Sequence, residues 1–135
     1  KDAVSVGVGI SSEKRIDKKG IMQAVFSAAR RALKRLSLTP DVVIFDGNVK
    51  IPGLKLLQMT LVQGDRKSAC VAAASIVAKV TRDRIMRGYA LKLPQYGFEK
   101  HKGYGTKLHY RRLEINGLSP IHRRSFCGFQ KTYLR

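Results

Sequence analysis

Two aspartates stand where short apolar runs give way to turn residues. Asp46 follows the run VVIF and opens the turn Asp46-Gly47-Asn48, and Asp65 follows Gly64 soon after the run LLQMTLV. Open α/β sheets bind ligands at the carboxyl ends of their strands, so two such carboxylates could converge on one divalent cation. The alternative is that Asp46 is a turn residue and Asp65 a helix cap. Taken alone, the residues leave both interpretations open.

A second stretch, from Tyr96 to Phe126, combines glycines, tyrosines and basic residues. Tyr104 stands between two glycines, so its ring could approach a sugar face, where the 2′-hydroxyl alone separates RNA from DNA at one residue. A tyrosine packed on the body of the protein is the alternative. Candidate phosphate ligands are the basic residues Lys67, Arg82, Lys102, Arg123 and Arg124.

Charge indicates the class of partner. The chain has 135 residues, enough for one domain, with 27 Lys and Arg against 9 acidic residues and a formal net charge of +18. Such an excess favours a polyanionic partner, with nucleic acid first. No apolar stretch approaches the roughly 20 residues that cross a bilayer, and no signal-like segment opens the chain. We therefore expect a soluble, cytoplasmic protein.

The cysteines and histidines do not suggest a metal centre. Cys70 and Cys127 lack the spacing of a zinc site or a disulfide framework and are predicted to be reduced packing residues. His101, His109 and His122 lack a metal-ligand spacing as well. We expect His101 near the site or at the surface and His122 packed against the protein.

The first half of the chain is predicted to alternate strands with a helix. Alternating apolar residues predict a strand over residues 4–10, and Asp17 can cap a helix that runs to about Leu36. The runs at 42–45 and 57–62 predict two further strands, the first of them buried on both faces.

The second half is predicted to be helical. Residues 69–91 have helical composition and period, and Pro94 closes this helix. Thr106 can cap another helix that runs to Asn116, with Gly117 just beyond its end.

Four motifs occur together in one order. They are DGN at 46–48, GDxKS at 64–68, AAASIVAKVTRD at 72–83 and HKGYGTxxH at 101–109. In this order and approximate spacing the chain resembles the C-terminal part of bacterial ribonuclease HII, from the Val4 segment to about Phe126. Arg66 departs from the small residue usual at that place in the second motif. Asp83 is expected to pair with neighbouring arginines such as Arg82.

The resemblance implies an α/β fold with a ribonuclease H-like mixed sheet flanked by helices and a helical C-terminal region. We expect a single domain over residues 1–135, with sheet and helices in 1–92 and a helical substrate-binding extension in 93–135. The implied activity is hydrolysis of the phosphodiester 5′ to a ribonucleotide, in an RNA–DNA hybrid or in DNA with embedded ribonucleotides. The complete protein is expected to be a monomer.

The resemblance also implies roles for particular residues. Asp46 and Asp65 match two of the four family carboxylates that bind Mg²⁺ or Mn²⁺ for two-metal phosphoryl transfer. Tyr104 matches the tyrosine that packs on the sugar beside the ribonucleotide. Nucleic-acid contacts are expected from Lys67, Lys102, Arg123 and Arg124.

One family segment has no counterpart in this sequence. The family's central first strand carries an Asp-Glu pair and a Gly-Arg-Gly turn, whereas Glu13, Glu99 and Glu114 all stand in other contexts. We therefore expect the chain to be the C-terminal portion of a longer enzyme, with little or no nuclease activity alone. The alternatives are a non-catalytic protein that binds hybrid or duplex nucleic acid, and a small basic ribosome-associated protein, which explains the charge but not the motifs.

Overall fold

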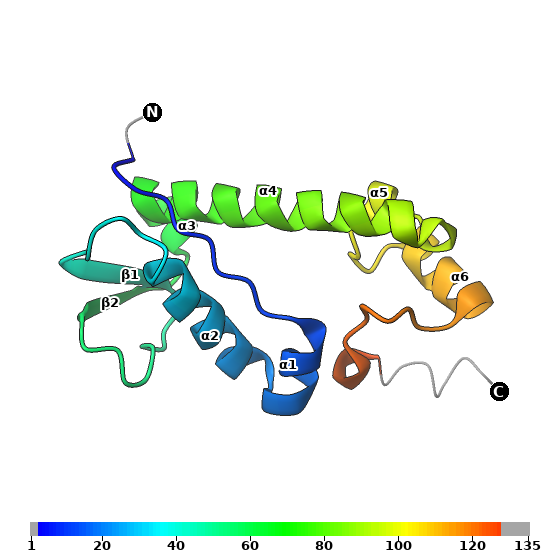
Figure 1. Ribbon diagram of the computed structural model, residues 1–135, viewed down its shortest axis with the longest axis horizontal. Coiled ribbons are helices and arrows are strands. Elements are labelled where there is room, and N and C mark those ends of the chain that lie inside the picture. The colour runs from blue at the N-terminus through cyan, green and yellow to red at the C-terminus, as the bar shows by residue number, and fades with distance from the viewer. Residues whose placement is uncertain (1–2, 128–135) are drawn as a thin grey trace. The chain divides into compact units, whose positions relative to one another are not determined.

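The computed structural model describes residues 3–127, which fall into two compact units, Lys1–Ala78 and Lys79–Arg135. We call them unit 1 and unit 2 and describe each by itself. The elements, labelled in Figure 1, are α1 (Glu13–Lys19), α2 (Ile21–Leu33), β1 (Val42–Asp46), β2 (Leu57–Leu61), α3 (Gly64–Lys67), α4 (Ala69–Lys92), η1 (Pro94–Tyr96), α5 (Phe98–His101), α6 (Lys107–Asn116) and η2 (Arg124–Phe126). The predicted α/β class is confirmed.

A two-stranded parallel sheet lies in unit 1. β1 and β2 pair from Val42 opposite Leu57 to Asp46 opposite Leu61, within one residue of the predicted strands. The prediction that β1 is buried on both faces is wrong, because its three central residues are only half-buried. The exposed side chains of β2 include Leu57 and Met59, at 68% and 57%. This sheet therefore presents apolar surface that the described residues do not cover.

The loop between the strands is fixed by one side chain. The Gln58 amide donates to the carbonyl oxygens of Ile51 and Leu54, at 3.1 and 3.2 Å, and its Oε1 accepts from the Ile51 N–H at 2.8 Å. Ile51 is 1% exposed. Gln58 thereby satisfies backbone groups that burial would otherwise leave unpaired.

The predicted single helix is two helices. Ser12 caps α1, accepting from the Arg15 N–H at 3.4 Å, and Gly20, at a φ of 80°, separates α1 from α2. Asp17 lies inside α1, so its prediction as the cap is wrong. On α2 the buried residues are Ala24 and Phe26, and the Phe26 ring centroid lies 6.2 Å from that of Phe45 in β1.

The strand predicted over residues 4–10 is absent: this segment is extended but has no strand partner among the described residues. It lies along α2 instead, held by Arg35 and Arg31, which donate to the carbonyl oxygens of Val8 and Ile10, each at 2.6 Å. A Cβ on Gly9 would stand 1.8 Å from the Ala28 carbonyl oxygen. The alternation arises because glycines face the α2 backbone, so the apolar residues between them are not a buried strand face.

α4 confirms the long predicted helix. It spans 24 residues, and Leu93 and Pro94 follow its last residue. Val71 is buried, but Ile76 and Val80 are 63% and 43% exposed. Cys70 is exposed rather than packed, whereas Cys127 is half-buried. No helix within residues 3–127 is long and apolar enough to cross a membrane.

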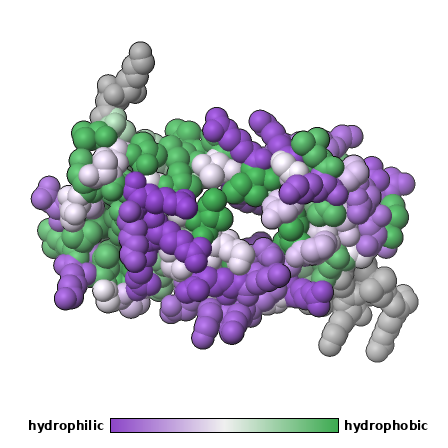
Figure 2. Space-filling model, in the orientation of Figure 1, coloured by the Kyte–Doolittle hydropathy of each residue, from purple (hydrophilic) through white to green (hydrophobic). Residues whose placement is uncertain are grey.

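Unit 2 has a compact aromatic core. Its buried residues Ala90, Tyr96, Phe98 and Leu113 are joined by half-buried apolar side chains from α4 and from the segment after α6. Thr106 caps α6 as predicted, accepting from the His109 N–H at 3.2 Å, and Gly117 follows its last residue at a φ of 70°. On the surface, hydrophilic and hydrophobic residues lie side by side (Figure 2).

Candidate functional site

Asp46 is the last residue of β1, and its carboxylate turns toward the segment that follows β2. Oδ1 accepts a hydrogen bond from the Gly64 N–H at 2.9 Å. The Gly47 N–H donates to the Leu61 carbonyl oxygen at 3.1 Å, which extends the ladder just past Asp46. A Cβ at position 64 would meet the Val71 side chain at 3.0 Å and Asp46 Oδ1 at 3.4 Å. Glycine therefore allows the two motifs to approach one another.

Asp65 follows Gly64 directly, in the first turn of α3 rather than at the end of β2. The chain enters this turn through Gln63, which has a left-handed φ of 56°. Both Asp46 and Asp65 are exposed at the edge where the parallel strands end. The structure therefore places the two predicted aspartates on neighbouring segments of one sheet edge.

The chemistry of this edge suits a hard divalent cation in part. Mg²⁺ is commonly held by one or two carboxylates, with waters and substrate phosphates completing its shell. Asp46 and Asp65 could supply that protein share. Among residues 3–127, no cluster of three or more His, Cys, Asp or Glu side chains could hold a metal ion. Within the described part of the chain, this edge therefore offers at most two acidic ligands.

The predicted tyrosine lies in a turn of unit 2. The Tyr104 side chain is 51% exposed, and the turn that carries it begins at Lys102 and Gly103, both left-handed, with φ values of 51° and 78°. The backbone N–H of Tyr104 donates to the His101 carbonyl oxygen at 2.8 Å. On the other side, a Cβ at Gly105 would stand 2.8 Å from the Tyr110 hydroxyl. The turn is thus compact, and the Tyr104 ring is accessible.

Arg82 lies over the Tyr104 ring. Its guanidinium carbon is 4.3 Å from the ring centroid, within the range of a cation–π contact. Arg82 also forms the predicted ion pair with Asp83, at 3.8 Å, which supports the structural role expected of Asp83. An arginine stacked on an exposed tyrosine brings positive charge and a flat aromatic surface to one place. This combination suits a sugar–phosphate backbone.

The other predicted basic residues have distinct local surroundings, Lys67 in unit 1 and the rest in unit 2. Lys67 is exposed at the end of α3, next to the exposed Arg66. The Lys102 ammonium donates to the Glu99 carbonyl oxygen of its own short helix, so it acts locally as a cap. Arg123 lies over the Phe126 ring, with its guanidinium carbon 4.2 Å from the centroid, and Arg124 is exposed.

Three histidines pack beneath the Tyr104 turn, and their contact with one another was not predicted from the sequence. The rings of His101 and His109 stack with centroids 4.3 Å apart, and the Phe98 ring lies about equally close to both and to His122, at 5.7, 6.0 and 5.8 Å. His101 is 5% exposed, so the surface position that was one of its two predicted places is wrong; it lies next to the Tyr104 turn, where its Nδ1 accepts from the Gly103 N–H at 3.1 Å. His122 is packed as predicted.

The protonation of this cluster reflects its burial. Burial lowers the pKa of His109 and His122 below the usual 6.5, and the neighbouring histidines lower it further, while a backbone hydrogen bond partly opposes the shift in each. One feature of the sequence could have indicated where His109 lies. It stands three residues after the Thr106 cap, and therefore in the first turn of α6, beside the loop that precedes this helix.

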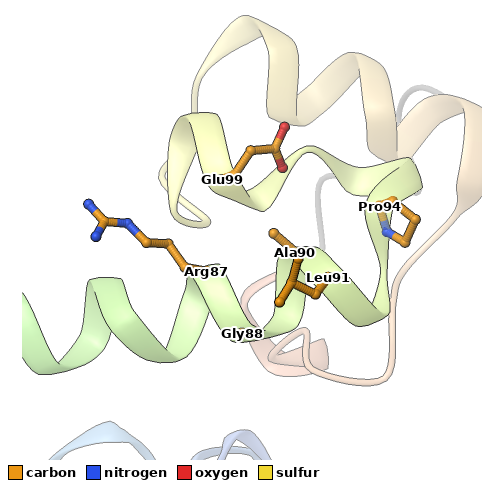
Figure 3. Close-up of a pocket in the computed structure, with 6 residues that line it drawn as sticks. All are labelled: Arg87, Gly88, Ala90, Leu91, Pro94 and Glu99. Atoms are coloured by element: carbon orange, nitrogen blue, oxygen red, sulfur yellow. The ribbon is translucent and has the colours of Figure 1, made fainter.

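A shallow depression elsewhere in unit 2 does not belong to this site. It is lined by Arg87, Gly88, Ala90, Leu91, Pro94 and Glu99, and the guanidinium of Arg87 extends away from Ala90 and Pro94 (Figure 3). None of the predicted site residues lines it.

Comparison with known proteins identifies the family. The family model for ribonuclease HII matches residues 1–129. Ribonuclease HII of Endomicrobium trichonymphae is 50% identical over 124 residues, which cover 92% of this chain and 59% of that protein. The enzymes named ribonuclease HII in Clostridioides difficile (strain 630) and Ligilactobacillus salivarius (strain UCC118) are 46% and 48% identical, over 93% and 98% of this chain and 49% and 51% of theirs. The chain thus spans about half to three fifths of the length of these relatives, and it belongs to the ribonuclease HII family.

Proposed function

We propose that this chain forms part of an endonuclease that hydrolyses the phosphodiester 5′ to a ribonucleotide, in an RNA–DNA hybrid or in DNA with embedded ribonucleotides. Mg²⁺ or Mn²⁺ would be held partly by Asp46 and Asp65. The observation that carries the proposal is the hydrogen bond from the Gly64 N–H to Asp46 Oδ1, which joins the two aspartate motifs at one sheet edge.

The chemistry expected at this edge is charge positioning. A bound divalent cation would lower the pKa of an attacking water and stabilise the leaving oxygen. The role of Asp46 and Asp65 is to hold that cation, whose charge would offset the repulsion between their carboxylates and a phosphate. The backbone N–H of Gly64 orients the Asp46 carboxylate, since an oxygen that accepts this bond is fixed relative to Asp65.

Recognition of the ribonucleotide is assigned to the Tyr104 turn. The exposed ring can lie against a sugar, and Arg82 above it can approach a phosphate. The large positive charge would draw a polyanionic duplex toward the protein at low salt. The choice between a single ribonucleotide and a long hybrid depends on contacts beyond this turn.

Metal binding by the chain itself gives the first test. Titration with Mn²⁺ should broaden the amide resonances of Gly64 and Asp65 in NMR spectra, because Mn²⁺ is paramagnetic. Asp46→Asn should abolish this site-specific broadening. The matched control is Asp41→Asn, since Asp41 is exposed just before β1 and is assigned no part in metal binding. Broadening that survives Asp46→Asn would contradict the proposed metal site.

Cleavage gives the second test. The substrate is a duplex with one embedded ribonucleotide, offered to the chain alone and to the chain fused to the part of the Endomicrobium trichonymphae protein that it does not match. We expect turnover from the fusion, lost by about a hundredfold or more with Asp46→Asn because charge stabilisation of the transition state is removed. A fusion that binds the duplex but shows no metal-dependent cleavage would favour the non-catalytic alternative.

A further inference from the structure

A chain of hydrogen bonds connects Ser119 to the Tyr104 turn through two imidazole rings. The Ser119 N–H donates to Nδ1 of His122 at 3.0 Å, and the Ser119 hydroxyl lies 2.7 Å from the same nitrogen. Nε2 of His122 lies 3.0 Å from Nε2 of His109, and Nδ1 of His109 lies 2.9 Å from the Tyr104 carbonyl oxygen. We call these four residues the histidine relay.

The two ends of the relay fix the proton on every nitrogen. A backbone N–H can only donate, so Nδ1 of His122 accepts and its proton is on Nε2. That Nε2–H then donates to Nε2 of His109, which leaves the His109 proton on Nδ1. This last N–H donates to the Tyr104 carbonyl oxygen, which can only accept. With both rings neutral, this one direction of donation satisfies the three contacts that run from the Ser119 N–H to the Tyr104 carbonyl oxygen.

We propose that His109 and His122 are positioning residues that hold the Tyr104 turn in its recognition geometry. This inference rests on the proposed function, in which Tyr104 contacts the sugar beside the ribonucleotide. Discrimination between ribonucleotide-bearing and all-DNA duplexes would therefore depend on two groups that do not touch the substrate.

An added proton would change the Ser119 end of the relay and leave the Tyr104 end in place. A second proton on His109 leaves its Nδ1–H on the Tyr104 carbonyl oxygen, and the new Nε2–H can donate to His122 once the His122 proton moves to Nδ1. The Ser119 hydroxyl oxygen, 2.7 Å from that Nδ1, can accept the moved proton, while the Ser119 N–H loses its acceptor. The contact with the Tyr104 carbonyl is therefore kept in both protonation states.

The surroundings make protonation costly but possible. The titratable groups that face the relay are His101 of α5, stacked on His109, Tyr110 of α6, whose ring centroid is 6.4 Å from that of His109, and Tyr96 of η1, at 5.8 Å from His122. Arg82 of α4 is a charged group over Tyr104. Burial and the neighbouring histidines lower the pKa of both relay rings, in agreement with neutral rings at physiological pH.

Nitrogen NMR of the whole chain tests the hydrogen bonds directly. The chain has three histidines, so ¹⁵N labelling of histidine gives a small set of ring resonances. We expect His109 to be protonated at Nδ1 and His122 at Nε2, with the pattern lost on acidification. His122→Phe, which keeps a ring but removes the donor, should release His109 from this tautomer. A His109 protonated at Nε2 in the unchanged chain would overturn the relay.

Binding of two duplexes tests the role in recognition. The probes are a labelled duplex with one ribonucleotide and the all-DNA duplex of the same sequence, both with a chelator present to prevent cleavage. His122→Phe should reduce the preference for the ribonucleotide roughly three- to tenfold, the effect of one lost hydrogen bond. His109→Asn places an amide N–H near the position of Nδ1 and should retain most of the preference.

A matched variant separates positioning from stability. Leu113→Ala empties part of the same core without touching a relay nitrogen, so it should lower stability but leave the tautomers and the preference of the folded protein unchanged. An equal loss of preference in Leu113→Ala and His122→Phe would overturn the positioning role. The unchanged chain could bind both duplexes equally while its ring resonances match the relay. That result would overturn both the role in recognition and the proposed function, and would leave only the chain of hydrogen bonds confirmed. The opposite result, a ribonucleotide preference with the wrong tautomers, would overturn the relay only.

Discussion

The Asp46 edge of unit 1 and the Tyr104 turn of unit 2 are built in different ways. At the edge, two parallel strands and one backbone N–H position the carboxylates, while apolar side chains of β2 stay exposed. At the turn, the side chains of a packed core position Tyr104, and the three histidines of that core are buried or half-buried. Unit 1 therefore depends on close backbone approach, and unit 2 on packing and on a polar network. Substitutions should affect the two units differently.

Removal of the central ring of unit 2 should have the largest effect. Phe98 is 1% exposed and contacts Tyr96 and all three histidines. Phe98→Ala should lower the free energy of unfolding of unit 2 by about 3–5 kcal/mol, because it leaves a cavity. Urea unfolding followed by hydrogen exchange in each unit measures this. Met59→Ala on exposed β2 is the control, expected within about 0.5 kcal/mol of the parent. Equal losses would show that the two units do not differ in packing.

The next effect tests backbone approach in unit 1. Gly9→Ala would drive a Cβ into the Ala28 carbonyl oxygen, so the extended segment must move off α2. We expect a loss of about 1–3 kcal/mol, typical of overpacking. The same change at Gly88, where an added Cβ meets nothing within 4 Å, should raise stability by about 0.5–1 kcal/mol. Thermal unfolding of both variants gives the comparison, and a neutral Gly9→Ala would contradict the close contact.

Helix caps provide a matched pair between the units. Ser12→Ala and Thr106→Ala each remove one side-chain cap, and each should cost about 1 kcal/mol. Only Thr106→Ala removes the cap from the first turn of α6, which contains His109. This substitution alone should therefore speed hydrogen exchange at the Tyr104 amide. If Ser12→Ala also speeds hydrogen exchange at the Tyr104 amide, the two units do not respond separately to the loss of a helix cap.

A mild change of pH should produce the smallest effect, confined to unit 2, which contains every histidine of the chain. Burial, with a further contribution from the neighbouring histidines, lowers the pKa of His109 and His122 from 6.5, so the unfolded chain binds these protons more readily. The stability they contribute is complete above the unfolded pKa and declines as the pH falls through 6.5 toward the lowered folded values. Hydrogen exchange at two pH values on either side of 6.5 measures this, and greater protection of unit 2 at the lower pH would reverse the sign.

Sequence patterns predicted the elements that have clear local boundaries. The two strands, α4 and α6 are marked by caps, glycines or proline, and each lies within one or two residues of its predicted range. The Asp46 edge followed from two strand-end motifs, because parallel strands bring their carboxyl ends together.

The predictions that failed depended on what packs against a segment. The alternation at residues 4–10 was typical of a strand, but a helix lies where a neighbouring strand was needed. Three further features depend on tertiary packing, which local sequence patterns do not encode. They are the burial of His101, the exposure of Cys70 and the histidine relay.

Gln63 and Lys102 each stand two residues before a proposed functional side chain, Asp65 in one case and Tyr104 in the other, and both adopt a left-handed backbone without being glycine. Such a residue typically costs about 1–3 kcal/mol, so glycine at either position should make the protein more heat-resistant. The same substitution would make the turn that orients the Asp65 carboxylate or the Tyr104 phenol more flexible. Glycine at these two turns would therefore raise thermal stability at the expense of a defined orientation of the Asp65 or Tyr104 side chain.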